Sequence, residues 1–134
     1  MTTFLVPTDS VHASAASCDY LAGRVTAADT VHAVNSLRGG DETSADDVRD
    51  GEEALNVVSS RLGGVTTVET HQFVRGNDPY EDILAKADDV DADELVIGIR
   101  KRNPTSKVVF GSTAQRTLLH SDRPIVAIPL EEMD

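Results

Sequence analysis

Residues 98–113 read GIRKRNPTSKVVFGST, and this stretch decides how the chain can fold. An apolar run at 95–97 leads into this turn-rich loop, and a helical pattern begins at Gly111. A helix that starts after such a loop directs unpaired N–H groups and the positive end of its dipole at one place, which favours an anion. We therefore expect an anion site in this loop. Its cations stand out in an otherwise acidic chain: Arg100, Lys101, Arg102 and Lys107.

Apolar runs alternate with helical patterns along the rest of the chain. Nearly continuous apolar strands that alternate with helices predict an α/β fold, an open parallel sheet with helices on both faces, in a single domain of residues 1–134. Between the second strand and the second helix we expect a polar loop at 36–44. The expected strands are 4–7, 30–34, 65–74, 95–97 and 124–129, and the expected helices are 11–23, 45–63, a short one from Pro79 with Asp78 as its N-cap, and 112–120.

The composition excludes several classes of protein. A net charge of −11 repels nucleic acid and anionic membranes, so we expect neither as a partner. No apolar run approaches the ~20 residues that span a bilayer, and the opening MTTFLVPTDS lacks the features of a secretory signal. One cysteine, Cys18, fits a reducing compartment. We therefore expect a soluble, cytoplasmic protein. The acidic composition with scarce lysine further suggests a halophilic one.

Motifs for metals and for other nucleotide folds are missing or broken. Asp89, Asp91 and Asp93 begin like a calcium loop, but Glu94 takes the required glycine position and Arg100 the position of the bidentate glutamate. No His/Cys cluster has zinc spacing, and there is neither a GxxxxGK[ST] loop nor a GxGxxG after the first strand. We expect no metal site in the protein, and we expect His32 to be a packed, hydrogen-bonded histidine.

Two loops have the composition of a binding site. In open α/β sheets ligands bind beyond the carboxyl ends of the strands, where the strand order reverses. Pro7-Thr8-Asp9 follows the first strand, and the 98–113 loop follows the fourth. Simpler roles remain open: Asp9 could cap the first helix and Ser112 the last, the glycines could serve turn geometry alone, and the cations could be solvated charges.

These features together resemble the universal stress protein family. Its nucleotide-binding members carry Gly, two residues, Gly, nine residues, Gly, then Ser or Thr. Gly98, Lys101, Gly111 and Ser112 reproduce that spacing, with lysine in place of the second glycine. VPTD, VHAV, GNDP and PIVAIP extend the likeness along nearly the whole chain. The resemblance implies the strand order 3-2-1-4-5 and a Rossmann-like site for ATP or another adenine nucleotide, with or without Mg²⁺.

The resemblance also implies roles for individual residues. Asp9 would bind the ribose hydroxyls, and the backbone at Ala33 would read the adenine edge. Lys101 has two opposite readings: its side chain either fills the space of the phosphates or, with Arg100, places positive charge on them. The remaining residues of the implied site are Pro7 and Thr8 in the first loop, Ile97 and Gly98 on the floor, and Gly111, Ser112 and Thr113 around the phosphates.

The implied function is regulatory. We expect an ATP-binding stress-response protein with little or no catalysis, because the sequence supplies no convincing base or nucleophile beside the phosphates; at most it is a slow ATPase. The alternative is a dimerisation or interaction module that binds no nucleotide because Lys101 closes the pocket. The resemblance implies a homodimer through the last strand, at Ile125, Val126, Ala127 and Ile128.

Overall fold

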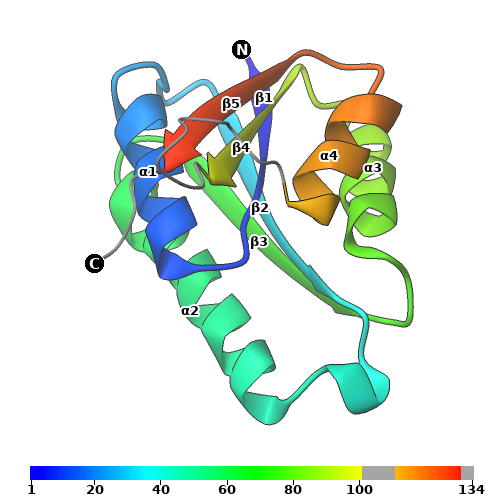
Figure 1. Cartoon of the computed structure of the whole chain (residues 1–134). Helices are drawn as coiled ribbons and strands as arrows, with labels where there is room; N and C mark the ends of the chain where they lie inside the picture. The colour runs from blue at the N-terminus through cyan, green and yellow to red at the C-terminus, as the bar shows by residue number, and fades with distance from the viewer. Residues whose placement is uncertain (101–110, 131–134) are drawn as a thin grey trace, which may run out of the picture.

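The computed structural model describes residues 1–100 and 111–130, which form one parallel sheet covered by helices (Figure 1). The sheet has five strands in the order β3-β2-β1-β4-β5, with every pair parallel. This confirms the predicted fold and strand order. The strands are β1 (Thr3–Pro7), β2 (Thr30–Leu37), β3 (Thr67–Val74), β4 (Glu94–Arg100) and β5 (Ile125–Leu130).

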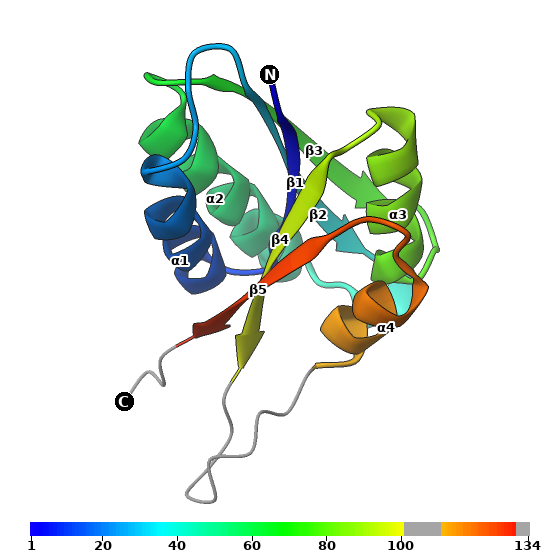
Figure 2. The ribbon, with the colours of Figure 1, turned by 90° about the horizontal axis from the view of Figure 1, so that it is seen from above.

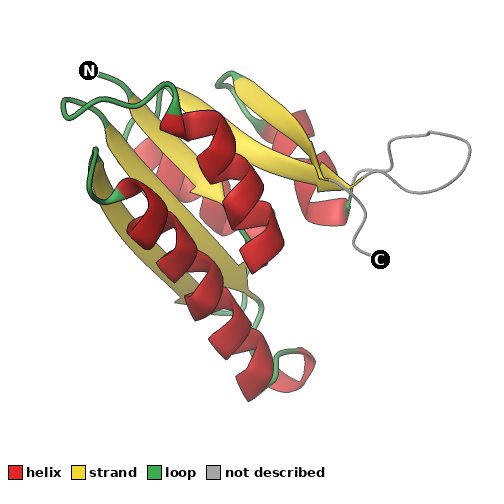
Figure 3. Cartoon of the chain, turned by 90° about the vertical axis from the view of Figure 1, so that its left-hand side faces the viewer, coloured by secondary structure: helices red, strands yellow, loops and turns green. Residues whose placement is uncertain are grey.

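Two helices cover each face of the sheet. In Figure 2 the pair α1 and α2 lies on one side of the strands and the pair α3 and α4 on the other, and Figure 3 shows the first pair side by side across the sheet. A 3₁₀ turn, η1 (Gly40–Glu42), precedes the second helix. The helices are α1 (Val11–Ala22), α2 (Ala45–Leu62), α3 (Pro79–Asp89) and α4 (Ser112–His120).

The largest departure from the predicted elements is at the end of β2. The sequence predicts a strand that ends at residue 34 and a polar loop from 36, whereas β2 continues to Leu37. It pairs with β3 along its whole length, from Thr30↔Thr67 to Leu37↔Val74. Asn35 and Ser36, which made the segment look like a loop, are buried in the strand with hydrogen-bonding partners. The prediction is wrong here because tertiary pairing overrides local propensity.

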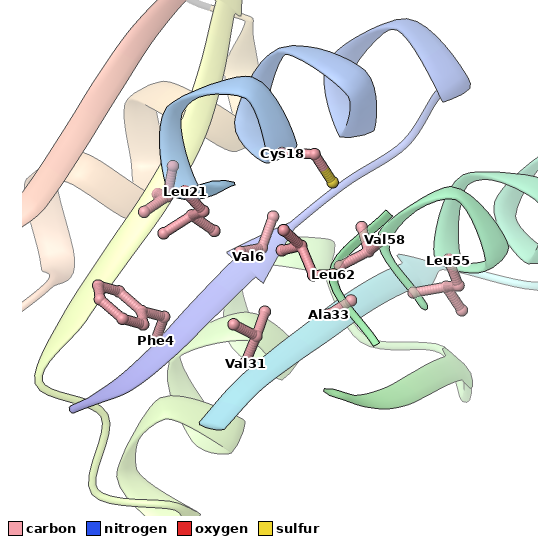
Figure 4. Close-up of a cluster of buried hydrophobic side chains, with 10 residues drawn as sticks. Phe4, Val6, Cys18, Leu21, Val31, Ala33, Leu55, Val58 and Leu62 are labelled. Atoms are coloured by element: carbon pink, nitrogen blue, oxygen red, sulfur yellow. The ribbon is translucent and has the colours of Figure 1, made fainter. Parts of the chain in front are cut away.

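Aliphatic side chains fill the interior, as the low aromatic content requires. On the α1/α2 face, Phe4 and Val6 of β1 and Val31 and Ala33 of β2 pack against the two helices (Figure 4). Full burial of one such side chain contributes about 1.5–3 kcal/mol. Because side chains alternate along a strand, the intervening residues face the α3/α4 layer. There Leu5 and Val34 pack in a second cluster with Ile83, Ala87 and Leu95.

The strand order creates an opening at one edge of the sheet. β1 and β4 pair through Phe4↔Glu94 and Leu5↔Leu95, and pairing between the described residues stops there. The chain then leaves β1 toward α1 on one face, whereas α4, the helix after β4, lies on the other. The carboxyl ends of the two strands therefore separate, and space opens between the loops that follow them.

Candidate functional site

A cavity of about 530 Å³ occupies this opening. Its wall is built by the ends of β1, β2, β4 and β5 together with the starts of α3 and α4. Most of the site residues predicted from the sequence lie on this wall: Pro7, Thr8, Asp9, Ile97, Gly98, Arg100, Gly111, Ser112 and Thr113. Segments more than ninety residues apart in the chain therefore meet at one place.

The two remaining predicted site residues are Lys101 and Ala33. Lys101 lies outside the described residues, as do Arg102 and Lys107 of the loop. Ala33 is fully buried, with its side chain in the core cluster on the α1/α2 face. Its neighbour Val34, which alternates to the other face, lines the cavity instead.

Several wall residues were not predicted from the sequence. Ser36 and Leu37 belong to the part of β2 that had been read as a loop, so their place at a strand end was hidden. Period-two alternation continued past residue 34 would have placed Ser36 beside Val34. The others come from elements that only tertiary packing brings to the opening: Ala13, Pro79, Ile83, Ala114 and Leu130.

The loop after β1 is held firmly at Thr8. The Thr8 N–H donates to the Val34 carbonyl at 2.9 Å, and the Thr8 carbonyl accepts from Asn35 Nδ2 at 2.9 Å. The Thr8 hydroxyl is 2.6 Å from the Ser14 hydroxyl, which itself donates to the Ala54 carbonyl. Because these groups are satisfied internally, Thr8 shapes the cavity floor.

Asp9, in contrast, projects from this loop into solvent. The cap of α1 is Ser10, whose hydroxyl accepts from Ala13 N at 3.1 Å, so the alternative that Asp9 caps this helix is wrong. The Asp9 side chain is 74% exposed, and a carboxylate oxygen lies 3.9 Å from the Arg100 guanidinium. This exposed ion pair is weak. Both groups thus stand at the mouth of the cavity, where a ligand can reach them.

The start of α4 forms the opposite wall. The N-cap is Gly111, so the alternative that Ser112 caps this helix is also wrong. No described side chain caps the helix, and its first turn holds no acidic residue. The φ of Gly111 is −62°, and an added Cβ would meet nothing within 4 Å, so among the described residues neither backbone geometry nor packing requires a glycine. The first N–H groups of α4 therefore border the cavity without a capping partner from a described side chain.

Gly98 has a packing reason to be glycine. A Cβ built there would lie 3.1 Å from the side chain of Leu130, on the neighbouring strand β5. Both residues line the cavity, so this close approach fixes the floor between β4 and β5.

The remaining end of the cavity is largely apolar but contains one hydroxyl. Val34, Leu37, Pro79 and Ile83 supply the apolar surface. Ser36 lies among them, and its hydroxyl donates to Asp82 Oδ2 at 2.7 Å.

Asp82 lies behind this wall, and its side chain is only 1% exposed. Its Oδ1 accepts from Arg75 Nε at 2.8 Å and from Asn77 Nδ2 at 3.0 Å. Burial alone would raise the pKa of Asp82, but the hydrogen bonds from Asn77, Ser36 and Arg75 outweigh it and lower the pKa below its ordinary value. The carboxylate is therefore ionised at neutral pH.

The cavity between β1 and β4 has on one wall a helix start that no described side chain caps, and this defines the class of protein. This is the arrangement by which Rossmann-like α/β proteins hold anionic ligands at the carboxyl edge of the sheet. A family model described as the universal stress protein family matches residues 1–129, and the chain belongs to that family.

Individual relatives agree with this assignment. A universal stress protein of Mycolicibacterium smegmatis is 49% identical over an alignment of 88 residues, with 58% of this chain and 68% of the relative covered. A solved universal stress protein from Archaeoglobus fulgidus is 33% identical, covers 96% of this chain and 98% of its own, and superposes with a TM-score of 0.78. The structure of the universal stress protein from Archaeoglobus fulgidus in complex with dAMP is 28% identical, with the same coverage and a TM-score of 0.72.

Two further features are absent from the described parts of the chain, a membrane-spanning helix and a metal-binding group. Over residues 1–100 and 111–130, no helix is both long and apolar enough to cross a membrane. Within the same ranges, no three His, Cys, Asp or Glu side chains are grouped so that they could hold a metal ion.

Proposed function

We propose that the cavity binds an adenine nucleotide, ATP or its monophosphate, and that the protein is a regulatory stress protein that responds to this ligand. The observation that carries the proposal is that an apolar wall, an exposed carboxylate and a helix start that no described side chain caps meet around one cavity. A volume of about 530 Å³ lies in the range of small-molecule sites. The related protein bound to dAMP supports the choice of an adenine nucleotide.

The two ends of the cavity suit the two ends of a nucleotide. The phosphates would lie at Gly111, Ser112 and Thr113, where backbone N–H groups and the helix dipole favour negative charge. Arg100 would add a cation on that side. Asp9, at the mouth between the two ends, would accept hydrogen bonds from the ribose hydroxyls. The base would lie on the apolar wall beside Ser36.

The same lining argues for binding rather than catalysis. Among the described residues that line the cavity, only Asp9 and Arg100 have ionisable side chains, and they face each other at 3.9 Å. A ribose hydroxyl bound by Asp9 would occupy the carboxylate that could otherwise act as a base. We expect phosphate release from ATP to be slow or absent, which a coupled phosphate assay would measure.

Thermal unfolding with AMP, dAMP and ATP, each with and without Mg²⁺, tests the proposal. A ligand at a hundred times its Kd stabilises the folded state by about 2.7 kcal/mol, so the unfolding temperature should rise by several degrees. The scans should be run in dilute buffer and in molar KCl, because the net charge of −11 destabilises the protein when salt is low. No shift with any nucleotide at millimolar concentration would overturn the proposal.

The contribution of Lys101 can be measured in the same assay. Lys101→Gly restores the glycine of the family pattern. If the lysine side chain places its charge on the phosphates, the variant should bind nucleotide less tightly. Binding that appears only in the variant would instead support the alternative function, an interaction module whose pocket the lysine closes.

We also propose that the protein forms a homodimer in which β5 of one subunit pairs with β5 of the other. This strand lies at the edge of the sheet, and Ile125, Val126 and Ile128 are only partly buried while Ala127 is exposed. An apolar edge strand of this kind tends to pair with another chain. Light scattering at micromolar concentration should give the mass of a dimer, and Ile128→Glu should give a monomer. A wild-type monomer would contradict this part of the proposal.

A further inference from the structure

Ser36 is the polar side chain on the otherwise apolar end of the cavity. It lies near the end of β2 and is buried, and its neighbours on the wall are Val34, Leu37 and Ile83. Among the described residues at this end, Ser36 alone would offer a flat, apolar ring a side-chain group able to form a directed hydrogen bond. The direction of that hydrogen bond then decides which ring is accepted.

The Ser36 hydroxyl can only accept from a ligand. A hydroxyl has one proton and two lone pairs, and the proton of Ser36 is donated to Asp82 Oδ2 at 2.7 Å. An ionised carboxylate has no proton to give back. Arg75 and Asn77 occupy the other oxygen of Asp82 and help to keep it ionised. Among the described residues none donates to the Ser36 oxygen, so its lone pairs carry no partner from the described part of the protein, and Ser36 is one of the residues that line the cavity.

We propose that Ser36 is the residue that selects the base, because its committed proton leaves an acceptor that pairs with the 6-amino group of adenine and opposes the 6-carbonyl group of hypoxanthine or guanine. This inference rests on the proposed function and goes beyond it. Asp82 acts through Ser36 and is a positioning residue, since it fixes the direction of the hydroxyl without contacting the ligand.

Three monophosphates that share the same ribose and phosphate test the selection in the wild-type protein. AMP carries an amino group at position 6, purine riboside 5′-monophosphate carries hydrogen, and IMP carries a carbonyl. AMP should bind at least about tenfold more tightly than IMP, since a mismatched buried acceptor pair is costly, and purine riboside monophosphate should lie between them. Equal binding of all three would overturn the inference while the proposed function stands. Failure of all three to bind would overturn both.

Asp82→Asn tests whether the direction of the hydrogen bond between Ser36 and residue 82 determines the choice of base. The amide oxygen of the new side chain suits the donors of Arg75 and Asn77, so its NH₂ group would face Ser36. The Ser36 hydroxyl would then accept from the amide, and its own proton would be free to donate into the cavity. The hydroxyl could then present either its proton or its second lone pair to the ligand, so the preference for AMP over IMP should be lost. A change in stability alone would leave the ratio of the two affinities as in the wild type.

Ser36→Ala and Ser112→Ala form a matched pair at the two ends of the cavity. Ser36→Ala should bring the AMP and IMP affinities within about twofold of each other, since the acceptor is gone. Ser112→Ala should weaken both ligands equally and leave their ratio as in the wild type. An unchanged ratio in Ser36→Ala would overturn the inference, because another group would then select the base. If a variant does not fold, the wild-type ligand series still decides the question.

Discussion

Two polar clusters lie at the carboxyl edge of the same sheet and differ in how far their groups are paired. The closed cluster consists of Ser36, Arg75, Asn77 and Asp82, in which the buried carboxylate accepts hydrogen bonds from all three neighbours. The open cluster consists of Asp9, Arg100, Gly111, Ser112 and Thr113, where the side-chain ion pair is a 3.9 Å contact between exposed groups. The closed cluster can contribute to folding and leaves a ligand the lone pairs of Ser36, whereas the open cluster leaves it charged side chains and the N–H groups at the start of α4.

The starts of α2 and α4 also differ in how far their backbone N–H groups are paired. At the start of α2, the Ser44 hydroxyl accepts from Asp47 N at 3.0 Å, and the Asp47 carboxylate accepts from Ser44 N at 2.9 Å. At the start of α4, Gly111 offers no side chain, and the first turn has no acidic residue. A bound anion would supply to α4 the partner that α2 provides for itself.

The largest expected effect on stability comes from breaking the closed cluster. Asp82→Ala leaves Ser36 without its buried acceptor and Arg75 and Asn77 without theirs. Loss of a buried, hydrogen-bonded carboxylate costs about 3 kcal/mol, and less where the partner cation is half-exposed, as Arg75 is at 52%. Urea unfolding should show a loss of about 2–3 kcal/mol. A loss below about 0.5 kcal/mol, the range of ordinary surface changes, would mean that the cluster is not a stabilising unit.

A smaller effect is expected at the self-capped helix. Ser44→Ala removes one half of the capping box of α2 and should lower the free energy of unfolding by about 1 kcal/mol. AMP affinity should not change, because Ser44 does not line the cavity. Ser60→Ala, at an exposed position in the last turn of the same helix, is the control and should be neutral or slightly stabilising. Equal effects at the two positions would contradict the capping argument.

Two neighbouring histidines, His32 on β2 and His71 on β3, should make the stability of the protein depend on pH. His32 Nδ1 and His71 Nε2 are 3.1 Å apart, a contact that needs one donor and one acceptor, and this confirms the prediction of a packed histidine at 32. Burial lowers the pKa of His32, against the effect of Glu69. Burial, with Lys86 and His32, lowers the pKa of His71, while Glu69 and Asp89 oppose the shift.

The sign of the pH effect follows from these lowered pKa values. The unfolded chain takes up both protons near pH 6.5, before the folded protein does. The stability that the neutral pair contributes is complete above pH 6.5 and should decrease as the pH falls below it. His71→Gln should make this decrease shallower in urea unfolding between pH 7.5 and 5. An equal slope in the variant would contradict a role for the pair.

The smallest effect on stability is expected in the open cluster. Asp9→Ala removes an exposed carboxylate that neither caps α1 nor makes a close ion pair with any described residue, so the free energy of unfolding should change by less than about 0.5 kcal/mol. AMP affinity should fall about tenfold through the lost bonds to the ribose. If stability fell and AMP affinity did not, Asp9 would belong with the closed cluster instead.

The features that the sequence predicted correctly are those set by local pattern. The alternation of apolar strands with helical patterns was enough to predict a parallel sheet. The resemblance to the family was enough to predict the order of its strands. The strand ending at Pro7 and the 98–113 loop were sufficient to locate the opening. The end of β2 was missed because Asn35 and Ser36 are polar and become strand residues only when β3 and their hydrogen-bond partners are in place.

The pairing of polar groups could not be predicted in the same way. Nothing near Asp82 in the sequence shows that Ser36, 46 residues earlier, donates to it. The choice of Ser10 over Asp9 as the cap of α1, and of Gly111 over Ser112 at α4, depends on the backbone angles of single residues. Gly98 looked like a phosphate-loop glycine, but its contact with Leu130 appears only when β5 is placed.

No described side chain caps the start of α4, which leaves its first N–H groups for a phosphate, and Ser112→Glu is the decisive test of this role. The new carboxylate would lie at the first helical position, where it stabilises the helix dipole by about 0.3–1 kcal/mol and repels an anionic ligand. Ser60→Glu adds the same charge on an exposed position of α2 and is the control. Calorimetric titration should show AMP binding to the wild type and to Ser60→Glu but not to Ser112→Glu, whose unfolding temperature without ligand should equal or exceed that of the wild type. AMP binding by Ser112→Glu with wild-type affinity would contradict the claim.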